Sequence, residues 1–423
     1  MSVLVREDVT ARVARGQPAE TSARQAGDAA ATVVFCGGGT GGHLTPGISV
    51  ARALLAIQPT TRVVFLLTGR AAEAPFFTIS GRTQAPAPAP GTAQPRAAVP
   101  QQFERYTIPA VRWPRGVLEM ARFPFRWVRV RCAGASRIGR LGPDAAVGLG
   151  GYGQYGPIRA AQRRQVPTIL LEQNAVPGKA NRLLSRGASA VCCQWEPARG
   201  LFPAGAPLYV TGNPIRQTIL LGSAPAAHAR FGLEPSRRTL LVLGGSQGSR
   251  RLNEAMAVAL KQCGALKGNW QVIHQTGVTD GEVLRGAYAR LGCPHFVAPF
   301  LEEAEMADAL ASADLAVSRA GATTLAELTA IGRPAVLFPL PARDQHQQRN
   351  AEVLQKAGAA RIVADTGDAR QSGADISRIL RHVCEHPGAL LEMAQGSSRL
   401  GVRDAARRVA ELIVKFCPGC REP

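Results

Sequence analysis

The chain has 423 residues, enough for two large domains, and its 46% hydrophobic content is typical of a globular protein. No segment approaches the roughly 18 consecutive apolar residues that a membrane-spanning helix needs, and residues 1–30 lack the apolar region of a secretory signal. These features exclude a membrane-spanning protein and predict one that stays in the cytoplasm.

The net charge is +20, from 50 Lys and Arg residues against 30 Asp and Glu residues. An excess of this size favours polyanionic partners, namely nucleic acid, anionic lipid or phosphorylated substrates. The charge alone does not choose among the three.

The nine cysteines are odd in number and scattered, which predicts reduced structural thiols rather than a disulfide framework. Cys417 and Cys420 have the spacing of metal ligands, and His382, Cys384 and His386 lie upstream. A zinc site normally shows a second tight pair, which this sequence lacks. We therefore expect no metal site, and a frayed, thiol-bearing tail.

The first predicted element is a short buried strand, Ala31–Cys36, which runs into the glycine loop Gly37–Gly42 and the amphipathic helix His43–Ala56. A second strand, Arg62–Thr68, follows at the distance expected for a right-handed crossover to a parallel neighbour. The same pattern restarts at Thr239–Leu243, with a glycine loop and a helix behind it. Further strands are predicted at Ala145–Leu149, Thr168–Leu171, Ala313–Ser318, Ala335–Phe338 and Ala360–Ala364.

Two such halves predict an α/β protein with two doubly wound, Rossmann-like domains. The expected order is a disordered extension over residues 1–30, a first domain over 31–215 with a flexible Pro-rich insertion at 83–101, a second domain over 216–400, a helix over 401–416 that returns to the first domain, and a tail over 417–423.

Gly37, Gly39 and Gly42 have the G-x-G-x-x-G spacing, which allows a close backbone approach to a phosphate at a helix N-terminus. A nicotinamide cofactor would need an acidic residue at the end of the second strand, and Leu67–Arg70 offers none. The Gly-Lys-Ser/Thr of a P-loop is also missing. Three glycine runs, Gly37–Gly42, Gly148–Gly153 and Gly244–Gly248, instead suit two phosphorylated ligands.

Six motifs carry a more specific signal. They are GGGTGGHLTPGISVA from Gly37, LEQN from Leu171, GNPIR from Gly212, GGSQGSRRLN from Gly244, RAGATTLAE from Arg319 and DQHQQRNA from Asp344. In content and order these motifs resemble those of the MurG family of glycosyltransferases, and the resemblance runs from about Ala31 to Phe416.

The resemblance implies the glycosyltransferase B fold, with the two domains facing across a cleft. It implies an inverting, cofactor-independent transfer of N-acetylglucosamine (GlcNAc) from UDP-GlcNAc to undecaprenyl-diphosphate-linked N-acetylmuramyl-pentapeptide. The β1→4-linked product is lipid II, the peptidoglycan precursor on which cell wall biogenesis, cell shape and cell division depend. Such an enzyme would work as a peripheral protein at the cytoplasmic face of the plasma membrane.

The same resemblance assigns a donor set in the second half. Ser246, with the amides around Gln247 and Gly248, would bind the donor diphosphate, whose negative charge grows as UDP leaves. Glu327 would accept hydrogen bonds from the ribose, and Phe300 and Leu301 would contact uracil. Residues of the DxHQ segment would contact the donor sugar, namely Asp344, His346 and Gln347, with Asn350 beside them. Arg216 would either bind phosphate or lock the hinge between the halves.

On the acceptor side, His43 is a candidate general base for the muramyl hydroxyl, because histidine titrates near pH 7. Glu172 is the rival base, a phosphate contact is the alternative role of His43, and Asn174 would orient the acceptor. The acceptor-binding loops would supply Gly39, Thr40, Gly41, Gly42, Gly151 and Tyr152. Here the chain departs from the family pattern GGYxSxP, since it reads GGYGQYGP from Gly150, with Gln154 in the place of the serine.

A basic, aromatic segment, Arg105–Arg131, contains Trp113, Phe123, Phe125 and Trp127 among seven arginines and one acidic residue. Rings beside cations suit the headgroup layer of an anionic membrane. Nucleic-acid binding would use the same residue types, and the transferase resemblance favours the membrane. Three other functions stay open: a UDP-GlcNAc 2-epimerase, a glycolipid transferase of the same fold, and an inactive UDP-sugar-binding membrane scaffold.

Overall fold

The computed structural model describes residues 30–39, 41–69, 103–109, 116–245, 248–264, 268–278, 280–342 and 344–420, and it leaves out the side chains of residues 117–119, 121, 123–124 and 126–127. All described elements fall in the unit Ala31–Pro423. The expected extension over residues 1–30, except for Ala30, and the Pro-rich insertion at 83–101 lie outside the described residues.

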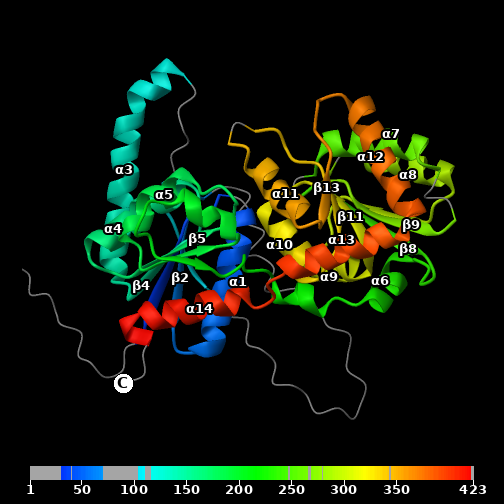
Figure 1. Cartoon of the computed structure of the whole chain (residues 1–423). Coiled ribbons are helices and arrows are strands. Elements are labelled where there is room, and N and C mark those ends of the chain that lie inside the picture. Colours follow the sequence, from blue (N-terminus) through cyan, green and yellow to red (C-terminus); the bar gives the residue numbers. More distant parts are fainter. Residues whose placement is uncertain are drawn as a thin grey trace, which may run out of the picture. The chain divides into compact units, whose positions relative to one another are not determined.

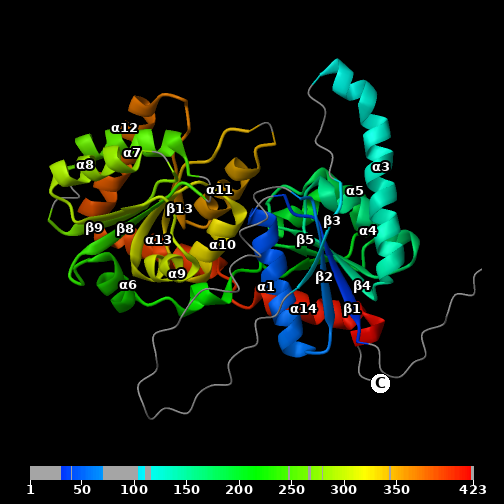
Figure 2. The ribbon, with the colours of Figure 1, turned by 180° about the vertical axis from the view of Figure 1, so that it is seen from behind.

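Two wholly parallel sheets organise this unit (Figures 1 and 2). The first has seven strands in the order β3-β2-β1-β4-β5-β6-β7, and the second has six in the order β10-β9-β8-β11-β12-β13. In both sheets the chain starts in the middle, runs outward to one edge and then crosses back to build the other side. The α/β, doubly wound fold class expected from the sequence is thus confirmed.

The first half contains the strands β1 (Thr32–Cys36), β2 (Arg62–Leu67), β3 (Glu104–Thr107), β4 (Ala145–Gly148), β5 (Thr168–Glu172), β6 (Ala190–Cys193) and β7 (Leu208–Val210). Its helices are α1 (Gly41–Ile57), α3 (Val117–Leu141), α4 (Tyr155–Arg163) and α5 (Lys179–Leu184), with short 3-10 turns η2 (Tyr152–Gln154), η3 (Ser185–Gly187) and η4 (Glu196–Leu201). Runs such as TVVFC and AVCC are buried along their whole length, as interior parallel strands require.

The second half contains the strands β8 (Arg238–Leu243), β9 (Trp270–Gln275), β10 (His295–Ala298), β11 (Ala313–Ser318), β12 (Ala335–Leu337) and β13 (Ala360–Ile362). Its helical elements are η5 (Gln217–Leu221), α6 (Ala224–Phe231), α7 (Arg250–Gln262), α8 (Gly281–Leu291), α9 (Glu303–Ser312), α10 (Ala322–Ala330), α11 (His346–Lys356), α12 (Ala369–Glu385) and α13 (Pro387–Leu400). Apolar clusters cover both faces of this sheet, one around Leu240 and Val272 and the other around Leu241 and Ile273.

The last helix, α14 (Ala405–Phe416), packs on the first sheet although it follows the second in the chain. Val409, Ala410 and Ile413 are buried in one apolar cluster with Val33 of β1 and Leu54 of α1. The red α14 therefore lies beside the blue α1 in Figures 1 and 2.

The end of the chain differs from its sequence expectation. Instead of fraying, the chain closes a 3-10 turn, η7 (Pro418–Cys420), and both Cys417 and Cys420 are buried against the first sheet. The physical reason is that α14 ends at the open edge of an apolar cluster, where small thiol side chains gain from burial.

Candidate active site

The residues singled out from the sequence gather at the carboxyl ends of the parallel strands. Gly39, Gly41 and Gly42 follow β1, Gly151 and Tyr152 follow β4, and Glu172 and Asn174 close β5. In the second half Gly248 follows β8, Phe300 and Leu301 follow β10, Glu327 lies on α10, and His346 and Gln347 begin α11. Doubly wound sheets bind ligands at this edge, near the strands where the order reverses. Thr40, Ser246 and Gln247 lie outside the described residues.

Two glycine turns of the first half approach each other closely. Gly37 has a φ of +118°, and a Cβ built on it would lie 2.9 Å from the carbonyl oxygen of Gly150. Gly150 has a φ of +105°, and a Cβ there would lie 2.5 Å from Cδ2 of His43. Only glycine at both positions lets the β1 and β4 loops meet with the His43 ring lying against the turn.

Glu172 is enclosed by four hydrogen-bond donors. Its Oε1 accepts from the backbone N–H and the Nδ2 of Asn174, at 3.0 and 3.4 Å. Its Oε2 accepts from the Gly178 N–H at 2.9 Å and from Nδ2 of Asn181 at 2.8 Å. Burial raises the pKa of Glu172, and these donors oppose the rise. The carboxyl group therefore fastens the loop after β5.

Asn174 and its neighbour connect the two halves through Asn350, which is fully buried on α11. Asn350 donates from Nδ2 to Oδ1 of Asn174 at 3.1 Å, and its own Oδ1 accepts from the Ala175 N–H at 2.8 Å. A second link joins the halves where the Thr323 hydroxyl donates to the Gly42 carbonyl at 3.2 Å. The loops after β1 and β5 and the starts of α10 and α11 are thus held to one another.

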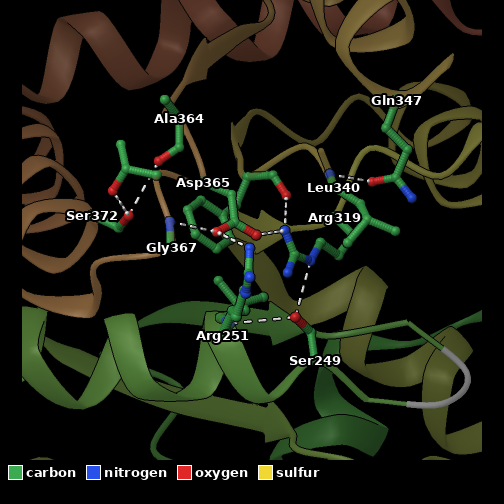
Figure 3. A network of polar contacts seen from close by, with 12 residues as sticks. Ser249, Arg251, Arg319, Leu340, Gln347, Ala364, Asp365, Gly367 and Ser372 are labelled. Carbon is green, nitrogen blue, oxygen red and sulfur yellow. Dashed lines mark hydrogen bonds and ion pairs between the residues drawn. The ribbon is translucent and has the colours of Figure 1, made fainter. Parts of the chain in front are cut away.

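A cluster of charged side chains supports the loops of the second half (Figure 3). Arg319 donates from Nη1 to Oδ2 of Asp365 at 2.9 Å and from Nε to the Ser249 hydroxyl at 2.9 Å. Its guanidinium also lies 4.7 Å from the centre of the Phe338 ring. Arg251 reaches Oδ1 of the same Asp365 at 3.3 Å. We call Arg319, Asp365, Arg251 and Ser249 the Arg319 cluster.

The Arg319 cluster fixes the start of α7. Ser249 is the N-cap of this helix, and its hydroxyl accepts from the Leu252 N–H at 3.3 Å. Burial lowers the pKa of Arg319, and Asp365 opposes that fall. Two arginines on one aspartate leave a net positive charge below the glycine loop that follows β8, where a helix N-terminus already favours an anion.

Glu327 is buried on α10 and is paired with Arg216. Both Nε and Nη2 of Arg216 donate to Oε1 of Glu327, at 3.0 and 2.9 Å. Burial raises the pKa of Glu327, and the Arg216 charge opposes the rise. This contact places Arg216, from the segment that joins the two sheets, directly behind the proposed ribose contact.

The loop after β10 is positioned by Gln275 at the end of β9. Its Oε1 accepts from the Leu301 N–H at 3.1 Å, and its Nε2 donates to the Gly245 carbonyl at 3.0 Å. Leu301 is buried, whereas Phe300 is 51% exposed and can face a planar ligand. The Gly248 N–H donates to Gly245 at 3.0 Å, so this amide is already used within the loop.

Gln347 is held by its oxygen at the start of α11. Oε1 accepts from the Ala320 N–H at 3.2 Å and from the Leu340 N–H at 2.9 Å, the second of which Figure 3 shows. This arrangement directs the amide donors of Gln347 away from the backbone. His346 lies 3.5 Å from Asp344 through Nε2. The structure thus gathers the DxHQ residues beside the end of β11.

The cysteines and histidines considered for zinc lie in different parts of the molecule, the histidines on its exposed surface. Cys417 and Cys420 pack on the first sheet, whereas the His382 and His386 rings lie 4.4 Å apart at the end of α12. Across the part of the chain that the structure describes, no cluster of three or more His, Cys, Asp or Glu side chains could hold a metal ion.

The basic segment forms β3 and the first half of α3, and residues 110–115 lie outside the described residues. Met120, Phe125 and Val128 of α3 are exposed, Phe125 by 81%, and so are Arg122 and Arg129. No described helix combines the length and the apolar character that crossing a bilayer demands.

Comparisons with known proteins show which family this chain belongs to. The glycosyltransferase family 28 N-terminal domain matches residues 33–193, and the C-terminal domain of the same family matches residues 239–409. A curated relative from Thermodesulfovibrio yellowstonii is 34% identical, with 90% of this chain and 97% of the relative covered. Its name is UDP-N-acetylglucosamine–N-acetylmuramyl-(pentapeptide) pyrophosphoryl-undecaprenol N-acetylglucosamine transferase. The chain belongs to the MurG family.

A solved MurG-family structure agrees with this assignment. MurG from Acinetobacter baumannii matches with a TM-score of 0.68 at 28% identity, covering 91% of this chain and 99% of that one. The UDP-GlcNAc 2-epimerase from Neisseria meningitidis has a TM-score of 0.62 at 12% identity, which shows a shared fold alone. This MurG-family chain therefore has the glycosyltransferase B fold.

Sequence reasoning missed three residues that support the candidate site. Asp365 and Asn181 lie outside the recognised motifs, and Arg319 lies inside a motif without an assigned role. Gln154 was expected to line the loop after β4, but its partners were not predicted. The signals for Asp365 and Asn181 were weak, because one acidic or amide residue after a strand or on a short helix is ordinary in any sequence.

Proposed function

We propose that this chain transfers GlcNAc from UDP-GlcNAc to undecaprenyl-diphosphate-linked N-acetylmuramyl-pentapeptide and so makes lipid II for peptidoglycan. Membership of the MurG family over nearly the whole chain carries this proposal. The acceptor binds to the first half, residues 31–215, and the donor to the second, residues 216–400. The product supports cell wall growth, cell shape and cell division.

In the reaction, the 4-hydroxyl oxygen of the muramyl sugar attacks the anomeric carbon of GlcNAc. The bond from that carbon to the UDP oxygen breaks with inversion, and UDP leaves with the electron pair. His43 accepts the hydroxyl proton, because its ring lies against the acceptor turn at Gly150. Glu172 is less suited to this role, since four donors already occupy its oxygens.

The second half stabilises the leaving UDP. Its diphosphate lies at the N-terminus of α7, near Ser246 and Gln247, where the helix dipole and the positive Arg319 cluster favour negative charge. Glu327 accepts hydrogen bonds from the ribose, Phe300 and Leu301 contact uracil, and Gln347, with His346, binds the sugar hydroxyls. Arg216 holds Glu327 in place rather than binding phosphate itself.

The first half binds the acceptor through its glycine turns. Gly39, Thr40, Gly41 and Gly42 approach the acceptor from the β1 loop, and Gly151 and Tyr152 do so from the β4 loop. Asn174 orients the acceptor sugar. The hydrogen bonds between the loops of the two halves hold these groups in a fixed position relative to the donor side.

A turnover assay tests the proposal. The full chain is incubated with UDP-GlcNAc and a short-chain lipid-diphosphate muramyl-pentapeptide, and UDP release and product mass are followed. The expected result is one GlcNAc added per UDP released, with β1→4 linkage. Release of UDP with N-acetylmannosamine formed, or binding of UDP-GlcNAc without turnover, would replace the proposal by an epimerase or by an inactive scaffold.

We propose further that α3 docks the enzyme on the anionic cytoplasmic face of the plasma membrane. At 100° per residue, the exposed Met120, Val128 and Phe125 fall within an arc of roughly 140°, and Arg122 and Arg129 lie side by side at its margin. In Figures 1 and 2 the start of this cyan helix extends beyond the first sheet. Such an arrangement lets apolar rings enter the interface while cations meet lipid headgroups.

Liposome co-sedimentation tests the docking. Neutralising Arg122 and Arg129 together with Phe125→Ser should reduce binding to vesicles that contain anionic lipid, and should leave UDP affinity unchanged. Wild-type binding should weaken with salt, because the Debye length falls from about 10 Å at 0.1 M to about 3 Å at 1 M. Equal binding by the variant would place the membrane contact elsewhere, and preferential binding to RNA would favour the nucleic-acid alternative.

A further inference from the structure

Gln154 is a fully buried amide at the end of the β4 loop, where η2 passes into α4. Its Oε1 accepts from the Gly150 N–H at 2.9 Å, and its Nε2 donates to Oδ1 of Asn181 at 2.7 Å. Both ends of the side chain are therefore paired, although the family pattern has a smaller serine at this place.

The first arm of Gln154 determines the shape of the turn at Gly150. This turn is the surface against which the His43 ring lies, since a Cβ at Gly150 would reach within 3.0 Å of Nε2 of His43. A change in the backbone conformation of Gly150 would therefore shift the ring of His43, the proposed general base.

The second arm leads to Asn174. Asn181 donates from Nδ2 to the Leu171 carbonyl at 2.9 Å and to Oε2 of Glu172 at 2.8 Å. The other oxygen of Glu172 accepts from the backbone and side chain of Asn174. Gln154, Asn181 and Glu172 thus form one continuous hydrogen-bonded chain that ends at Asn174.

We infer that Gln154 is a positioning residue for glycosyl transfer, which sets His43 through Gly150 and Asn174 through Asn181 and Glu172. The inference rests on the proposed function. Gln154 itself is buried below the loop and touches neither substrate. We expect a change at Gln154 to impair the reaction with the acceptor rather than donor binding, because His43 and Asn174 both belong to the proposed acceptor side.

The test compares Gln154→Ala, Gln154→Met and Asn181→Ala in the full chain. Each should lower kcat/KM for the lipid acceptor by about 10- to 100-fold, the loss typical of a small misplacement of reacting groups. KM for UDP-GlcNAc and the Kd of UDP should change less than about twofold, since the donor half is untouched. The double variant Gln154→Ala/Asn181→Ala should lose little more than the worse single variant, because the residues act in one chain.

Methionine at position 154 separates hydrogen bonding from packing, since it fills a similar volume without the amide. It also keeps the test valid if the alanine variant does not fold. Wild-type acceptor kinetics in Gln154→Met would overturn the inference, and so would an equal loss of donor affinity.

Gln162→Ala is the matched control. Gln162 is on α4, the helix that follows Gln154, and like Gln154 it reaches α5, donating from Nε2 to the Leu184 carbonyl at 2.9 Å, but it lies away from the glycine turn. It should lower the melting temperature without selectively raising the acceptor KM. If wild type makes no product, the proposed function fails; if wild type is active and Gln154→Met matches it, only this inference fails.

Discussion

The loops after β4 and β5 are joined by neutral amide side chains and one carboxyl group, whereas the loops after β8 and β11 rest on arginines and buried acids. The first arrangement contains Gln154, Asn181 and Asn174 around Glu172. The second contains the Arg319 cluster and the pair Arg216–Glu327. The two sheets share one strand order, with β7 as an additional strand in the first, so we relate the difference to the chemistry proposed for each half.

Amides fix position without adding charge, which suits the proposed acceptor half, where a neutral hydroxyl would be oriented and deprotonated. The net positive charge of the Arg319 cluster suits the proposed donor half, where a diphosphate would gain negative charge as its bond to the sugar breaks. The comparison therefore predicts that changes in the first half affect turnover and that changes in the second affect donor affinity and stability.

The largest expected effect tests the first half. His43→Ala should lower kcat by about 10²- to 10⁴-fold, the usual contribution of a general base. The Kd of UDP, measured by calorimetry, should stay at the wild-type value because the proposed donor site is in the other half. A variant that kept wild-type kcat would return the role of base to Glu172 or to another group.

The second effect concerns the buried charge of the donor half. Asp365→Ala leaves Arg319 buried without its partner, and this should lower the free energy of unfolding by about 3–5 kcal/mol. Urea titration would measure the loss. The control is Arg251→Ala, whose more exposed side chain should contribute about 1 kcal/mol or less. Equal losses from the two variants would mean that the cluster acts as a surface ion pair.

Acid should lower the free energy of unfolding through a buried histidine of the second half. His274 is fully buried on β9 between Tyr288 and Asn253, and burial lowers its pKa from 6.5 to about 3. A lowered histidine pKa gives stability that is complete above the unfolded value and is lost as pH falls from 6.5 toward 3. The loss should reach about 2 kcal/mol at pH 5. Urea titrations above pH 6.5 and at pH 5 would measure this loss. In His274→Asn the free energy of unfolding should depend less on pH.

Donor affinity should respond to Glu327. Glu327→Ala should weaken UDP binding by about 1.5–3 kcal/mol, the range for hydrogen bonds to a charged group. It also frees Arg216, so Arg216→Ala serves as the companion variant, with a smaller expected effect. Unchanged UDP affinity in calorimetry would remove Glu327 from the ribose site.

The smallest expected effect is that of metal removal. Turnover in excess chelator should persist, because the diphosphate is assigned to amides, Ser246, the α7 dipole and the Arg319 cluster. If turnover were lost completely in chelator and restored by Mg²⁺ or Mn²⁺, a bound cation would help to neutralise the diphosphate, a role that we assign to the arginines.

The fold class was predictable because buried parallel strands consist of short apolar runs that can be recognised in the sequence. Thr239–Leu243 and Ala313–Ser318 match β8 and β11 to within a residue or are the same. The parallel pairing of β1 with β2 followed from the crossover rule, whereas the order of the other strands was not predicted. The frayed tail was a wrong expectation, because the burial of Cys417 and Cys420 depends on an apolar edge that only the folded first sheet creates.

The candidate site was predictable in position but not in its supports. Glycine loops at strand ends locate a ligand edge, and motifs assign residues to it. The partners of those residues come from distant segments: Asp365 meets Arg319 across 46 residues, and Asn350 meets Asn174 across 176. The local sequence carries no trace of such pairings, and likewise does not reveal that the Gly248 amide is used within its own loop.

The return of α14 to the first sheet has a consequence for how the protein is made. On the ribosome, strands β1 to β7 emerge long before Val409 and Ile413, whose side chains close the same apolar cluster. At the usual 5–20 residues per second, the intervening segment over residues 212–404 takes roughly 10–40 s to synthesise. During that interval the face of α1 that α14 covers stays open to solvent or to a chaperone. The first half is thus begun first and finished last, and a nascent chain that stopped before α14 would have both sheets but an uncovered apolar cluster on the first.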